Sequence, residues 1–370
     1  MTLLRSERLA AVILLAAAVV GLVLANSPLG HTALEVQHAA LGPLSVGHWI
    51  SDGLLAVFFF AAAVELKHEL AHGELTSVKR AMRPAIAAVF GVAVPALVYL
   101  VIAGRDFPNG WPIPTATDIA FALGVLALCG RGLIPSRIRV FLLALAVIDD
   151  IIAIAIIAVF FTTSVDWLAL LLSVVCVVVA GVLSRVRHRS VVPLVVLAAC
   201  GAWWFMVQSG VHATIAGVLV GLAVALRPGQ RARHILEPAI NGAILPLFAL
   251  SAALVAVPDV GGTGLASAFW GIAIALPLGK IVGIGLGGVI GAAIARERID
   301  AFALVTVGAL GGIGFTVSLL MNELAFASHD DIRAEGTLAV LLGSGASIVL
   351  AGVLVALLAG RYRRARRAQR

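Results

Sequence analysis

Four ionisable side chains lie in the middle of otherwise apolar segments: Asp118, the adjacent Asp149 and Asp150, and Lys280. An ionisable group at the centre of a bilayer costs about 2.5–3.5 kcal/mol on insertion scales, so such residues are candidates for function. The four lie at similar depths in their segments, which suggests that three carboxylates and one ammonium form one site. Carboxylate oxygens bind hard cations, and the same oxygens can hold protons. The four residues therefore predict exchange of a cation for protons.

The two adjacent aspartates must face different partners. Neighbouring residues project about 100° apart on a helix, so Asp149 and Asp150 cannot both face one small ion. One can line a cation cavity while the other faces a partner such as Lys280, and two carboxylates this close titrate as a coupled pair. The alternative is a structural ion pair that holds helices together. The functional interpretation is favoured because one ammonium cannot balance three carboxylates.

Two of the segments that must position these groups contain helix-breaking residues. In the segment at 111–129, two prolines and two threonines precede Asp118. Proline removes helical hydrogen bonds and glycine weakens helices, and interrupted helices indicate a transporter site at the membrane midplane. The ends of such helices carry partial charges, so Asp118 could neutralise one set of ends and Lys280 the other. The second broken segment, at 301–326, has three glycines near its centre: Gly311, Gly312 and Gly314.

The composition is that of a membrane protein. The chain has 370 residues, of which 61% are hydrophobic and 12% charged, and its mean hydropathy is +1.10; ordinary soluble domains carry about 25% charged residues. A spanning helix needs about 20 mostly apolar residues. We therefore expect an all-α polytopic membrane protein, a single transmembrane domain over 1–370. Its apolar segments number twelve, near 9–25, 52–71, 84–103, 111–129, 138–161, 166–184, 191–207, 210–226, 238–257, 266–294, 301–326 and 335–359.

The basic residues predict the orientation. Of the 26 lysines and arginines, 23 fall at one set of alternate segment ends, Arg105 and Arg333 fall at the other, and Lys280 lies inside a segment. Lysine and arginine are enriched in cytoplasmic loops, so both termini are expected in the cytoplasm. This distribution explains the net charge of +7 without nucleic-acid binding. The three cysteines lack metal-ligand spacing, and we expect no cofactor.

Five further residues are candidates for a cation funnel or for pH sensing: Glu65, His68, Glu69, His212 and His234. The first three share one helix face by their i, i+3 and i+4 spacing, and histidine changes charge near neutral pH. The alternative for this face is a solvated helix end. For His212 the alternative is a packed, hydrogen-bonded histidine.

Five motifs occur in order along the chain: TATDIAFALG at 115–124, AVIDD at 146–150, SGVHAT at 209–214, GK at 279–280 and GGIGFT at 311–316. Together they resemble the NhaA family of sodium/proton antiporters over nearly the whole sequence. The resemblance implies a twelve-helix fold in the bacterial inner membrane, in which an inverted repeat crosses two broken helices, segments four and eleven. It also implies electrogenic exchange of cytoplasmic Na⁺ or Li⁺ for more than one incoming proton.

The resemblance also implies roles for individual residues. Asp150 and Asp149 would bind the cation and the protons, and Lys280 would pair with an aspartate and compensate helix ends. Thr117 and Asp118 would sit where the broken helices cross.

The sequence departs from the family at three places. The family's best-known members carry arginine where this chain has His68, and the proposed pH-sensing cluster differs at Arg233 and Glu237. The loop at 26–51 is short where the family can have a dimerising β-hairpin, and we expect strands only within 44–49. A homodimer is therefore one candidate assembly.

Two other classes of protein could use intramembrane aspartates. An intramembrane aspartyl protease would need two aspartates oriented as a dyad, but Asp149 and Asp150 are adjacent and the sequence has no Gly-x-Gly-Asp pattern. A passive cation channel could use broken helices and carboxylates. The position of Lys280 at the same depth as the aspartates favours an antiporter.

Overall fold

The computed structural model describes residues 7–72, 78–130, 133–161, 165–186, 188–255, 264–295 and 300–368. Nearly all of these residues are helical. Among the described residues, six helices are long and apolar enough to cross a membrane, or up to eight spans result if each of two sharply bent helix pairs counts as one span. The chain is therefore an all-α polytopic membrane protein, as the composition predicted.

The chain forms two compact units. The first unit is built from Ala17–Gly73 and Ile154–Leu254, and the second from Ser6–Ala16, Glu74–Ala153 and Val255–Arg370. Helices α1 (Glu7–Ala25) and α7 (Ser136–Phe160) contribute residues to both units.

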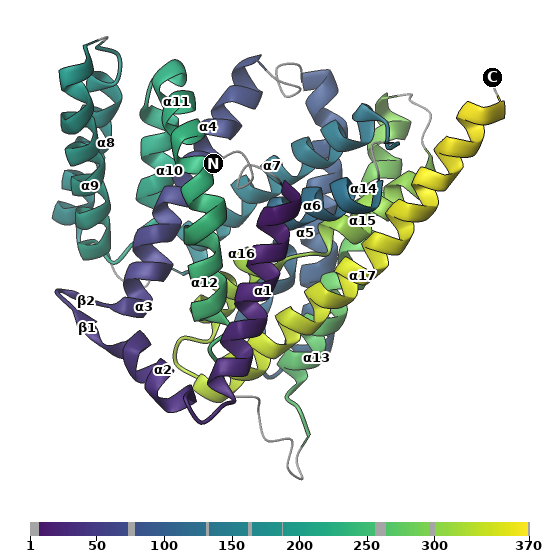
Figure 1. The fold of residues 1–370 in the computed structure, drawn as a ribbon, viewed down its shortest axis with the longest axis horizontal. Helices are drawn as coiled ribbons and strands as arrows, with labels where there is room; N and C mark the ends of the chain where they lie inside the picture. The colour runs from purple at the N-terminus through teal and green to yellow at the C-terminus, as the bar shows by residue number, and fades with distance from the viewer. Residues whose placement is uncertain are drawn as a thin grey trace. The chain divides into compact units, whose positions relative to one another are not determined.

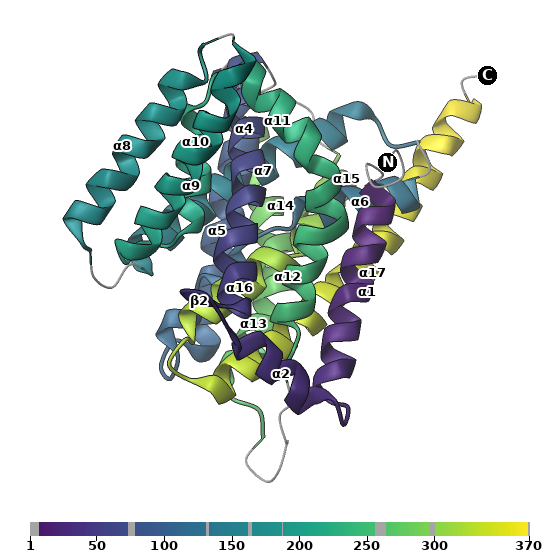
Figure 2. The ribbon, with the colours of Figure 1, turned by 60° about the vertical axis from the view of Figure 1, so that its left-hand side comes forward.

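The first unit pairs α8 with α9 and α4 with α10 (Figures 1 and 2). Helix α8 begins after Asp166, whose carboxylate accepts hydrogen bonds from the backbone N–H of Leu168 and Ala169 at 2.9 and 3.1 Å. Such a cap satisfies N–H groups that have no partner within the helix. The elements of this unit are α2 (Gly30–His38), β1 (Ala40–Leu41), β2 (Leu44–Ser45), α3 (Val46–His48), the π-helix η2 (Trp49–Leu54), α4 (Leu55–His72), α8 (Trp167–Leu183), the 3₁₀ helix η6 (Arg189–Val191), α9 (Val192–Gln208), α10 (Thr214–Ala223), α11 (Leu226–Ala239), the π-helix η7 (Ile240–Ile244) and α12 (Leu245–Ala252).

The second unit includes the long C-terminal helix α17 (Asp330–Ala368), drawn in yellow in Figure 1. This helix contacts α6, α13, α15 and α16. The other elements of the unit are α5 (Val78–Ala103), the 3₁₀ helices η4 (Pro108–Gly110) and η5 (Ile113–Thr115), α6 (Ile119–Gly130), α13 (Ser267–Ile274), the π-helix η8 (Ala275–Gly279), α14 (Lys280–Ala295), α15 (Ala301–Gly311) and α16 (Phe315–Ala325).

Glycines bring α5 and α14 into close contact. A Cβ atom at Gly287 would lie 2.8 Å from the Cα of Ala87, and one at Gly283 would collide with the carbonyl oxygen of Phe90. The two glycines are four residues apart, a spacing that lets membrane helices approach through their backbones. This packing holds α14, and with it Lys280, against α5.

Three expected boundaries differ from the structure. Residues 226–239 form the helix α11, where the sequence predicted a loop before a segment at 238–257, because the search for apolar length passes over a polar, amphipathic helix. Helix α10 covers only Thr214–Ala223, shorter than the expected 210–226. The expected strand region at 44–49 contains only β2, which pairs antiparallel with the unpredicted β1 through a turn in which Gly42 has φ +68°.

Candidate functional site

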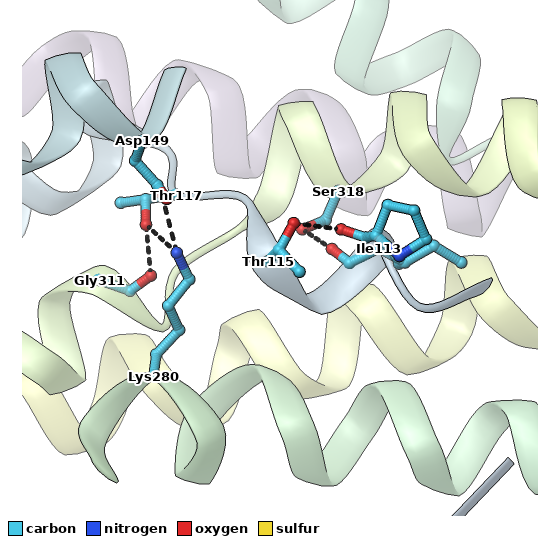
Figure 3. A network of polar contacts seen from close by, with 8 residues as sticks. Ile113, Thr115, Thr117, Asp149, Lys280, Gly311 and Ser318 are labelled. Atoms are coloured by element: carbon cyan, nitrogen blue, oxygen red, sulfur yellow. Dashed lines mark hydrogen bonds and ion pairs between the residues drawn. The ribbon is translucent and has the colours of Figure 1, made fainter. Parts of the chain in front are cut away.

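A buried polar network in the second unit joins Lys280, Asp149 and Thr117 (Figure 3). The ammonium of Lys280 donates to Asp149 Oδ2 at 2.8 Å and to Thr117 Oγ1 at 2.9 Å. The Lys280 side chain is 0% exposed and that of Asp149 is 2% exposed. Breaking a buried ion pair is costly because one charge is left without a partner. The sequence left open which aspartate faces Lys280, and the structure shows that it is Asp149.

Each member of this network comes from a different element. Asp149 lies in the middle of α7, and Lys280 is the first residue of α14, directly after the π-helix η8. Thr117 lies in the non-helical stretch between η5 and α6. Its hydroxyl donates to the carbonyl oxygen of Gly311 at 2.8 Å, at the C-terminal end of α15. Lys280 therefore reaches the negative end of α15 through Thr117.

Asp118 binds the positive ends of two helices. Its Oδ1 accepts a hydrogen bond from the backbone N–H of Phe121 at 3.1 Å, at the start of α6. Its Oδ2 accepts bonds from the Thr316 hydroxyl at 2.6 Å and the Thr316 backbone N–H at 3.2 Å, at the start of α16. A carboxylate at a helix N-terminus is favourable because the exposed N–H groups there carry partial positive charge. One carboxylate thus compensates the partial positive charges at the starts of two helices.

The backbone leaves the helical path between α15 and α16, and the two helices are bent by 49° relative to one another. A Cβ at Gly312 would lie 2.8 Å from Ser347 Oγ, and one at Gly314 would collide with Ser318 Oγ. The Ser318 hydroxyl donates to the carbonyl oxygen of Ile113 at 2.7 Å (Figure 3). Close by, the Thr115 hydroxyl donates to the carbonyl oxygen of Pro112. A side chain at 312 would also crowd the backbone of Leu276 and Pro277, at 3.0 and 3.2 Å, and one at 314 would displace the Ser318 hydroxyl from Ile113.

The comparison with known proteins decides the family. The family described as Na⁺/H⁺ antiporter 1 matches residues 1–355. The chain belongs to this antiporter family. It is 60% identical to the Na(+)/H(+) antiporter NhaA 2 of Clavibacter michiganensis, with 99% of this chain and 93% of the relative covered. It is also 44% identical to the NhaA antiporter of Tropheryma whipplei over 98% of this chain and 96% of the relative, and 39% identical to that of Vibrio parahaemolyticus over 95% of both.

Membership of the antiporter family confirms the resemblance found in the sequence. The relatives are named as antiporters, not as enzymes. Neither the protease nor the channel gains support from these names.

The remaining aspartate of the antiporter motif, Asp150, is half-buried on α7. Its neighbour Asp149 uses Oδ2 for Lys280, while its buried Oδ1 has no hydrogen-bond partner among the described residues. A carboxylate oxygen in this situation is available to a cation or a proton. Within the described ranges, no three His, Cys, Asp or Glu side chains are grouped as a metal site.

The five candidates for pH sensing or a cation funnel lie in the first unit, where Glu65 and His234 each face a charged side chain. Glu65 forms an ion pair with Arg233 at 2.7 Å, and both side chains are about one-third exposed, 31% and 34%. His234 Nδ1 lies 3.5 Å from Glu237 Oε2. Glu69 lies half-buried on α4. The departures at Arg233 and Glu237 thus place a cation against Glu65 and a carboxylate against His234.

His212 pairs with a residue that the sequence analysis did not consider. Its Nδ1 lies 3.8 Å from Asp52 Oδ1, with both side chains less than one-fifth exposed. The backbone carbonyl of Asp52 accepts a bond from the Trp203 indole at 2.9 Å. Asp52 could have been predicted from the sequence, because it is a carboxylate at the start of the apolar segment at 52–71.

The Thr117 hydroxyl can be tested because two conservative replacements separate its size from its chemistry. In Thr117→Val, Lys280 loses one acceptor and the Gly311 carbonyl loses its donor. An unmade buried hydrogen bond costs about 1–3 kcal/mol, so we expect a lower melting temperature for the purified protein. Thr117→Ser keeps the hydroxyl and is expected to melt close to the wild type. Equal melting temperatures for wild type and Thr117→Val would contradict this role.

Proposed function

We propose that this chain exports Na⁺, and Li⁺, from the cytoplasm in exchange for protons, and that Asp149 and Asp150 bind both. The observation that carries this assignment is the buried Asp149 carboxylate, with one oxygen on Lys280 and the other without a hydrogen-bond partner among the described residues. A carboxylate held in this way can exchange its partners without losing all of them.

The proposed cycle rests on competition at the carboxylates. With the site open to the cytoplasm, deprotonated Asp149 and Asp150 bind Na⁺. With the site open to the other side, protons bind to the carboxylates and displace Na⁺. Because adjacent residues on α7 point about 100° apart, Asp150 lines the cation path while Asp149 faces Lys280. Exchange is then obligatory, since the same oxygens hold either the cation or the protons.

The proposed arrangement in the membrane has twelve spans in a single transporter domain, with both termini in the cytoplasm of a bacterial cell. In it, α15–α16 and η5–α6 are the two broken helices of an inverted repeat and cross near the midplane. The contacts of Asp118 with the starts of α6 and α16, and of Thr117 with the end of α15, support this arrangement. The unpaired backbone N–H and C=O groups at the ends of broken helices inside a membrane must find hydrogen-bond partners within the protein.

Two subsidiary assignments remain proposals. The first is pH sensing or a cation funnel by Glu65, His68, Glu69, His212 and His234. The Glu65–Arg233 ion pair supports an electrostatic cluster of this kind. The second is a homodimer.

Transport should be electrogenic, because more than one proton enters for each Na⁺ that leaves. In proteoliposomes containing the purified protein, an inside-negative potential set by K⁺ and valinomycin should accelerate Na⁺ export from the lumen when the protein is oriented with its termini inside. Reversing the potential should slow it. An exchange rate that is the same at both potentials would contradict the proposed stoichiometry, and no Na⁺-dependent proton movement at all would contradict the function.

A further inference from the structure

The end of α4 carries a metal-ligand spacing that the proposed binding of Na⁺ and protons at Asp149 and Asp150 does not use. Residues 68–72 read His-Glu-Leu-Ala-His, which has the spacing H-E-x-x-H. On a helix this spacing places two imidazoles one turn apart on the same face, an arrangement that binds zinc. So short a motif is often found in sequences that bind no metal. Whether it can form a metal site here depends on whether the two imidazole rings lie close together in the fold.

The structure brings the two imidazoles together. Both residues lie in α4 (Leu55–His72), and their ring centroids are 5.7 Å apart with planes inclined by only 18°. The His68 ring is half-buried, and its Nδ1 is buried without a hydrogen-bond partner in the described part of the chain. His72 is exposed at the helix end, so its ring is accessible from solvent. Two imidazoles thus lie one turn apart, and the Nδ1 of His68 has no hydrogen-bond partner among the described residues.

The charged side chains around the two histidines balance one another. Glu65 lies one turn before His68, and Glu69 follows His68 directly. Arg233 is held by Glu65 at 2.7 Å, and Lys67 donates to the carbonyl oxygens of Leu222 and Val224 at 2.6 and 2.7 Å. Glu65 offsets the charge of Arg233, whereas Lys67 keeps its charge on neutral carbonyl oxygens and is balanced by Glu69. Affinity for a metal ion therefore rests on the two imidazole nitrogens.

We propose that His68 and His72 form a binding site for a divalent transition-metal ion, with Zn²⁺ as the occupant. Neutral imidazole is a common zinc ligand, and water completes the tetrahedral shell that zinc prefers. Because no third His, Cys, Asp or Glu joins a metal group among the described residues, the site binds zinc without the three protein ligands typical of zinc catalysis. None of its residues belongs to the proposed exchange site, whose residues lie in the second unit.

Zinc binding can be measured without transport. Isothermal titration of the full-length, tag-free protein with ZnCl₂ at pH 7.5 should show one ion per chain. His68→Ala and His72→Ala should each weaken binding at least about tenfold, the scale expected for loss of metal-site interactions. His38→Ala is the matched control, because His38 is a single exposed histidine at the end of α2; it should bind zinc as the wild type does.

Two further measurements keep the proposal open to refutation. X-ray absorption at the zinc edge should detect two imidazole ligands in the wild type and one in His72→Ala. Na⁺-dependent proton flux of His72→Ala without zinc should equal that of the wild type, which shows that the variant is folded. The proposal is overturned if the wild type binds no zinc, if both histidine variants bind it as tightly as the wild type, or if the absorption spectrum shows no imidazole ligand. None of these outcomes bears on Na⁺/H⁺ exchange.

Discussion

Replacing Asp150 by asparagine is expected to abolish Na⁺-dependent proton flux in proteoliposomes. The substitution removes one negative charge from the pair that is proposed to bind Na⁺, and the amide cannot take up and release a proton near neutral pH. Asp150 is half-buried and is not the partner of Lys280. The Lys280–Asp149 ion pair should therefore survive, and the melting temperature should change little.

Asp166→Asn provides the matched control for Asp150→Asn. Asp166 caps the start of α8 through Oδ1, and asparagine is an equally good capping residue. This variant makes the same chemical change at an exposed helix cap in the first unit, and its proton flux should equal that of the wild type. If Asp150→Asn transports as well as Asp166→Asn, the assignment of the site is wrong.

Replacing Lys280 by methionine is expected to cause the largest loss of stability in the second unit. The Asp149 carboxylate, 2% exposed, would lose its ion pair, and Thr117 would lose a donor. Removing one partner of a buried ion pair costs about 3–5 kcal/mol, so the melting temperature of the purified protein should fall sharply. Na⁺ transport should also be impaired, because the uncompensated carboxylate would favour its protonated form.

The double variant Lys280→Met/Asp149→Asn separates stability from function. It removes both charges, so most of the lost stability should return, since well-packed neutral residues often replace a buried ion pair at little cost. Transport should not return, because Asp149 is one of the proposed binding carboxylates. A Lys280→Met protein that melts at the wild-type temperature would show that the ion pair has no structural role.

Much of the candidate site was predictable because charge inside an apolar segment is conspicuous. Asp118, Asp149 and Lys280 stand out for that reason, and the structure places Asp118 at two helix starts and Lys280 on Asp149. Ser318 and Ser344 were not predictable in the same way. They donate to Ile113 and accept from the Phe315 N–H, respectively, but small hydroxyl residues are common in membrane helices for packing alone.

The fold was predictable where hydrophobic length was the deciding signal and less so elsewhere. Helix α7 (Ser136–Phe160) agrees closely with its apolar segment at 138–161. Helix α11 (Leu226–Ala239) was missed because its polar residues do not satisfy a test based on apolar length. The Glu65–Arg233 pair joins α4 to that missed helix, so this contact could not be predicted either.

The central claim is that Na⁺ and protons compete for Asp149 and Asp150. The most direct measurement is the release of protons when Na⁺ is added to the purified protein in weakly buffered solution with a pH indicator. We expect the wild type to release more than one proton for each Na⁺ bound, and Asp150→Asn to release fewer or none. Release that is undiminished in Asp150→Asn, or Na⁺ binding by the wild type without any proton release, would contradict the account.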